Sequence, residues 1–101
     1  MSSINIVLKH LDQPELLTQL AEEAAELAQA ALKLRRAVTG TNPTPLSPIE
    51  AHKALLEEVG DVMNGLEALG LLNSFELGRI TRGRLEKMDR WAERLAEKEG
   101  K

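Results

Sequence analysis

Three long segments of this chain repeat apolar residues with the period of an α-helix, and proline and glycine separate them. The first segment, QPELLTQLAEEAAELAQAALKLRRAVTG, begins beside Pro14 and ends at Gly40. Its leucines and alanines recur every three or four residues, which places them on one face of a helix. Proline favours the first helical turn and glycine the position after the last. We therefore predict a helix over residues 15–38.

The other two segments carry similar boundary signals. The stretch SPIE, residues 47–50, offers serine as N-cap, proline in the first turn and glutamate at the capping-box position. A second helix is therefore predicted over residues 48–70. The third begins after a cap at Asn73 or Ser74 and continues to about residue 98.

The remaining stretches are shorter. TGTNPTPLSP, residues 39–48, is rich in proline, which predicts an extended loop inside one domain. The N-terminal stretch INIVLKHL is compatible with a strand or a short helix, and we favour a short helix that packs on the others. Residues 1–101 are thus expected to form a single all-α domain.

Composition limits the classes of function. The chain has no cysteine, which excludes disulfides and thiolate chemistry, and its net charge of -3 gives no drive toward a nucleic acid polymer. No leader or membrane-spanning stretch is evident, so a soluble cytoplasmic protein without a membrane partner is expected. Only Phe75 and Trp91 are aromatic, so the core must be built from Leu, Ala, Val, Ile and Met, and its modest size in so short a chain favours self-association.

Two acidic patterns recur in the first two predicted long helices, as LAEEAAEL and LLEEVGDV. Each residue turns a helix by about 100°, which places Glu23 and Glu26 about 60° and 120° to one side of the apolar stripe. Glu58 and Asp61 fall about 85° and 145° to the same side of the second stripe. Antiparallel packing of the two stripes relates the helices by an approximate two-fold axis. The four carboxylates should therefore converge.

Converging carboxylates repel each other and take up protons unless a cation lies between them. Oxygen ligands, with no cysteine and no histidine at matching spacing, favour Mg²⁺ or Mn²⁺ over zinc. Glu22 and Glu57 point away from the stripes and are expected in solvent. A single acidic helix face is usually a solvated surface with partners such as Lys33, but its recurrence on the next helix favours a metal site.

The paired motifs resemble those of the MazG-like, all-α nucleoside triphosphate pyrophosphohydrolases. The signature of that family is EExxE on one helix and ExxD on the next, matched here by Glu22, Glu23, Glu26, Glu58 and Asp61. A basic KxxR pattern on the tail helix is matched by Lys87 and Arg90, and the resemblance covers most of residues 15–95. The chain departs from the family in its long proline loop and in lacking the aromatic residues with which many members stack on a base.

The resemblance implies a four-helix-bundle-like fold assembled as a homodimer or homotetramer. It also implies Mg²⁺-dependent hydrolysis of a ribo- or deoxyribonucleoside triphosphate between its α and β phosphates, which yields a monophosphate and pyrophosphate. The metal ligands and catalytic residues would be Glu23, Glu26, Glu58 and Asp61.

Further substrate contacts are expected outside the acidic motifs. Lys87, with Arg90 further round the helix, is placed to clamp the outer phosphates or the leaving pyrophosphate. Arg84 lies within about 20° of the apolar centre of its helix and either extends outward or meets an acid or a phosphate. Asn64 and Gln19 each lie one turn from an acidic motif, where they contact sugar or base or are ordinary surface amides.

Two other functions compete with the pyrophosphohydrolase. A di-iron bundle usually needs Glu-x-x-His pairs, and neither His10 nor His52 follows a glutamate by three residues. A non-catalytic helical module that binds a partner or a nucleotide remains the main alternative. On either scaffold, Gly60 and Gly65 lie in mid-helix, which predicts close approach of another helix at both positions.

Overall fold

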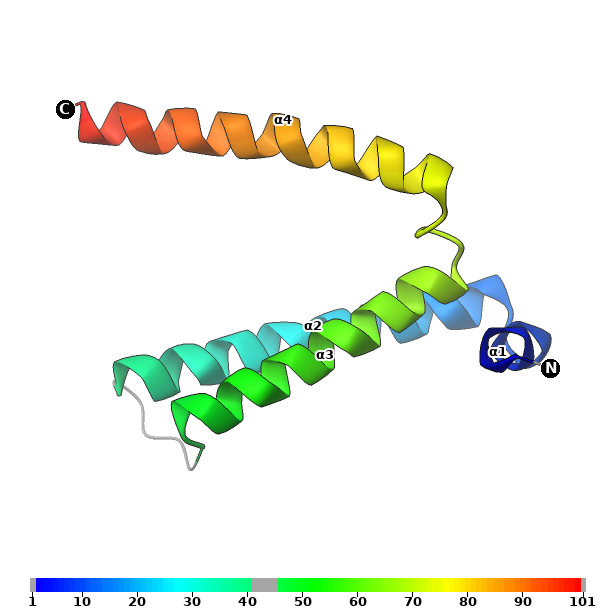
Figure 1. Cartoon of the computed structure of the whole chain (residues 1–101). Helices are drawn as coiled ribbons and strands as arrows, with labels where there is room; N and C mark the ends of the chain where they lie inside the picture. The colour runs from blue at the N-terminus through cyan, green and yellow to red at the C-terminus, as the bar shows by residue number, and fades with distance from the viewer. Residues whose placement is uncertain (1, 41–45, 101) are drawn as a thin grey trace. The chain divides into compact units, whose positions relative to one another are not determined.

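A computed structural model describes residues 2–40 and 46–100, and these residues form four helices (Figure 1). The helices are α1 (Ser3–His10), α2 (Gln13–Thr39), α3 (Pro48–Ala68) and α4 (Ser74–Glu99). The described ranges contain no strand, so the all-α prediction is confirmed, as is the short N-terminal helix. Each long helix begins and ends within two residues of its predicted boundary. Residues 41–45 of the predicted proline loop lie outside the described residues.

Side-chain caps set where α2 and α3 begin. Asp12 Oδ1 accepts a hydrogen bond from the Glu15 backbone N–H at 2.9 Å, and the Glu15 carboxylate accepts one from the Asp12 N–H at 3.0 Å. Ser47 Oγ accepts from the Glu50 N–H at 3.2 Å, as the sequence predicts. These bonds satisfy N–H groups that have no partner within the helix. At the other end of α2, Gly40 adopts a left-handed φ of 67°, which glycine does without strain.

Residues Met1–Gly70 form one compact unit, in which α2 and α3 run antiparallel as a helical hairpin and α1 packs on α3 (Figure 1). The buried apolar residues of the hairpin are few: Leu16 and Ala30 on α2, and Ala51 on α3. Much of the apolar surface of both helices is therefore only partly covered. Leu56 and Met63 share one side of α3, where they form an apolar flank, and are 58% and 52% exposed.

Close packing of α2 on α3 accounts for glycine at position 65, one of the two mid-helix glycines. A Cβ atom added at Gly65 would lie 3.4 Å from Leu20 Cδ1 and 3.7 Å from the Leu20 Cα, so α2 and α3 approach closely at this point. The same prediction is wrong for Gly60, where an added Cβ would meet no atom of the described residues within 4 Å. Gly60 lies on a side of α3 that does not face α2.

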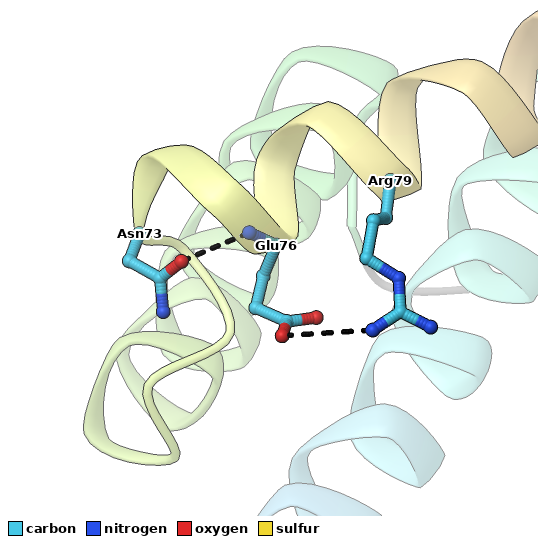
Figure 2. A network of polar contacts seen from close by, with 3 residues as sticks. All are labelled: Asn73, Glu76 and Arg79. Atoms are coloured by element: carbon cyan, nitrogen blue, oxygen red, sulfur yellow. Dashed lines mark hydrogen bonds and ion pairs between the residues drawn. The ribbon is translucent and has the colours of Figure 1, made fainter.

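Residues Leu71–Lys101 form the second unit, which consists mainly of α4. Figure 2 shows how its first turn is fixed: Asn73 Oδ1 accepts from the Glu76 N–H at 2.9 Å, and the Glu76 carboxylate lies 3.9 Å from Arg79 Nη1. The Arg79 guanidinium also lies 5.9 Å from the centre of the Phe75 ring. None of the described helices is long and apolar enough to span a membrane.

Candidate metal centre

Carboxylates from α2 and α3 meet where the two helices pack. Glu23 and Glu26 project from α2 and Glu58 from α3, and one oxygen of each lies within 4.8 Å of the other two. We call these three residues the acidic triad. The oxygens are close enough for a single cation to contact all three after small side-chain rotations. Three of the four carboxylates that were expected to converge therefore do so.

The triad is partly removed from solvent. Glu23 and Glu58 are half-buried, whereas Glu26 is exposed. The Oε2 atoms of Glu23 and Glu58 are buried and have no hydrogen-bond partner among the described residues. Burying a carboxylate oxygen without a partner is unfavourable, and a cation coordinated there would offset that penalty. The oxygen-only donor set therefore fits a hard divalent cation such as Mg²⁺ or Mn²⁺.

The pKa values of two triad residues are also those expected of a site that binds a cation. Partial burial raises the pKa of both Glu23 and Glu58 above the ordinary value of 4.5, and repulsion from Glu26 and Asp61 raises it further. A hydrogen bond from Gln19 acts in the opposite direction on the pKa of Glu23. The ionised form of both carboxyl groups is thus disfavoured, and a bound cation would stabilise it.

The other acidic residues of the motifs take different positions. Asp61 is exposed and lies outside the triad, although it is near enough to repel the charges of Glu23 and Glu58. Its larger rotation from the apolar stripe accounts for its exposure. Glu22 and Glu57 are also exposed and outside the triad, as their helical angles predict.

A hollow of about 510 Å³ opens beside the triad, bounded by α1, α2 and α3. Its polar lining includes Gln19 and Asn64, the two amides expected to contact substrate, together with Glu23 and Asp61. The apolar wall is supplied partly by Val7 of α1. A volume of this size is within the range of small-molecule sites. A ligand held here would lie beside one member of the triad.

A smaller hollow of about 280 Å³ adjoins the other side of the triad. Lys33 and Gln29 line it together with Glu26 and Glu58. From the sequence, Lys33 is expected only as a partner of acidic residues on the surface. Its place two helical turns after Glu26 on α2 was the signal that both residues share one face. The contribution of α1 to the larger hollow had no comparable signal, because the apolar pattern of α1 is too short to give its packing.

The basic residues expected to bind phosphate lie on α4, in the second unit. Lys87, Arg90 and Arg84 are all exposed. Their role in phosphate binding remains a prediction, as does membership of the MazG-like group, which rests on the motif residues of α2, α3 and α4. The chain matches no family model, no curated protein and no solved structure in comparisons with each.

Proposed function

We propose that this chain is a Mg²⁺-dependent nucleoside triphosphate pyrophosphohydrolase with a four-helix-bundle-like, MazG-like fold. The observation that carries the proposal is the acidic triad, in which Glu23 and Glu58 bury carboxylate oxygens that have no partner among the described residues. The reaction class comes from the spacing of the acidic motifs, which resembles that of the MazG-like pyrophosphohydrolases. Mn²⁺ is expected to substitute for Mg²⁺, since both prefer oxygen ligands.

In this reaction water attacks the α-phosphorus, and the bond from that phosphorus to the oxygen bridging to the β-phosphate breaks. The products are a nucleoside monophosphate and pyrophosphate. Glu23, Glu26 and Glu58 would hold the cation, and Asp61 would supply a further negative charge beside them. A bound Mg²⁺ would supply positive charge to the triphosphate and lower the pKa of the attacking water.

The two hollows suggest how a substrate lies across the triad. The larger one offers apolar surface from α1 and the amides of Gln19 and Asn64, which suit a sugar and a base. The smaller one offers Lys33, which suits a phosphate. Lys87, Arg90 and Arg84 of α4 are exposed, and their contact with the outer phosphates stays a prediction from the sequence.

Self-association belongs to the same proposal. The hairpin of α2 and α3 has few buried residues, and its apolar flank leaves Leu56 and Met63 more than half exposed. Exposed apolar surface of this kind is typical of helices that pack against another subunit. A homodimer or homotetramer would cover it.

The test is pyrophosphate release from a panel of ribo- and deoxyribonucleoside triphosphates, with and without Mg²⁺. The wild type should release pyrophosphate from at least one of them only when Mg²⁺ is present. Glu58→Gln should abolish the release, whereas Glu57→Gln, one residue earlier on the exposed face of α3, should leave it unchanged. A folded wild type that is inert toward every triphosphate would favour the alternative of a non-catalytic helical module.

A further inference from the structure

Gln19 lies one turn before Glu23 on α2, and the two side chains are hydrogen-bonded. Gln19 Nε2 donates to Glu23 Oε1 at 2.7 Å, which is short for an amide and a carboxylate. The second oxygen, Oε2, is the buried one that has no partner among the described residues. The two oxygens of Glu23 therefore have different environments, because Oε1 accepts from the Gln19 amide and Oε2 has no partner among the described residues.

We propose that Gln19 is a positioning residue for the acidic triad: by holding Glu23 Oε1, it fixes the carboxylate so that Oε2 stays available to a divalent cation. The inference rests on the proposed metal-dependent function. It gives Gln19 a role in addition to the direct contact with sugar or base expected from the sequence.

Pre-organisation is the physical basis of this role. A glutamate on a helix surface samples several rotamers, and a cation that binds it must restrict those rotamers. A hydrogen bond already present in the cation-free protein reduces that cost. Removing such a partner of a metal ligand typically lowers metal affinity by about 10- to 100-fold.

Gln19 is not placed to hold the helices of the fold together. Its side chain is exposed, and its partner lies on the same helix. Replacing it by methionine, which has similar length and helix propensity but no donor, should leave the fold intact. Gln13 is a matched control, because it is an exposed glutamine of the same helix that lines neither hollow.

The experiment is a titration of the nucleotide-free protein with Mn²⁺, followed by electron paramagnetic resonance. Gln19→Met should bind Mn²⁺ at least about 10-fold more weakly than the wild type. Gln19→Asn, whose amide is one methylene too short to keep the bond, should show a similar loss. Gln13→Met should bind as the wild type does, and all three variants should keep the wild-type melting temperature without metal.

The possible results separate the two proposals. Wild-type affinity in both Gln19 variants, with clear Mn²⁺ binding by the wild type, would overturn the positioning role and leave the proposed function standing. Absence of Mn²⁺ binding by the folded wild type would overturn both. A loss confined to the two Gln19 variants would support the positioning role, because these measurements contain no nucleotide for Gln19 to contact.

Discussion

Glu23 on α2 and Glu58 on α3 each bury one carboxylate oxygen at the contact between the two helices, and neither oxygen has a hydrogen-bond partner among the described residues. Both residues also repel Glu26 and Asp61, and their pKa values are raised. A protein usually avoids this arrangement, because burying unpaired carboxylates destabilises the native state. The proposed cation would bind there and offset this repulsion.

The raised pKa values predict how stability depends on pH without metal. Glu23 and Glu58 bind protons more tightly in the native state than in the unfolded state, where the value is near 4.5. Their contribution to stability should therefore be complete below that value and should be lost as the pH rises through the raised pKa. Thermal melts of Glu58→Gln should show a weaker dependence on pH than the wild type over this window, and Glu57→Gln should match the wild type.

Saturating Mg²⁺ should change that dependence. The cation competes with protons for the same carboxylates and binds only the native state, so it should raise the melting temperature most at neutral pH and least near pH 4.5. Thermal melts of the wild type over this pH range, with and without Mg²⁺, measure the effect. An equal shift at both ends of the range would contradict the triad as the binding site.

Gly60 and Gly65 should respond differently to alanine. An added Cβ at Gly60 has no atom of the described residues within 4 Å, so Gly60→Ala should stabilise the protein by about 1 kcal/mol through helix propensity. At Gly65 the added Cβ would lie 3.4 Å from Leu20 Cδ1, so Gly65→Ala should gain less, and Gly65→Leu should destabilise. Urea denaturation of the three variants measures these differences, and equal gains for both alanine variants would argue against the close helix contact.

The cap of α3 can be tested in the same way. Ser47→Ala should lower stability by about 1 kcal/mol, because the Glu50 N–H loses its acceptor. Ser74→Ala is the control, since Ser74 begins α4 but Asn73 caps it. The control should stay within about 0.5 kcal/mol of the wild type in urea denaturation.

Self-association should depend on the exposed apolar flank of the hairpin. Met63→Lys places a charge on that flank at a site that is 52% exposed, so the single chain should tolerate it. Light scattering should give the wild type a multiple of the 11.1 kDa chain mass and the variant a lower value. Glu57→Lys, away from this flank, should keep the wild-type mass. A wild type that scatters as a single chain would contradict the proposed oligomer.

Local signals in the sequence predicted most of the fold. Ser47 and Gly40 mark helix ends because capping and a left-handed φ depend on neighbouring residues alone. Helical angles likewise separated Glu23 and Glu58 from Glu22 and Glu57, since rotation about one axis decides which side faces the partner helix.

The remaining features depend on packing that no local pattern contains. Glu26 and Asp61 are both exposed residues of the acidic motifs, yet only Glu26 joins the triad. Gly60 resembles Gly65 in the sequence and differs from it only in which side of α3 it occupies. The wall that Val7 supplies to the larger hollow depends on how α1 packs, which eight residues cannot specify.

Calorimetric titration with Mn²⁺ of the folded wild type, Glu58→Gln and Glu57→Gln shows whether a divalent cation binds between α2 and α3. We predict saturable binding by the wild type and by Glu57→Gln, and loss of that binding in Glu58→Gln. Binding that survives in Glu58→Gln, or a folded wild type that binds no Mn²⁺, would contradict a divalent cation held between α2 and α3.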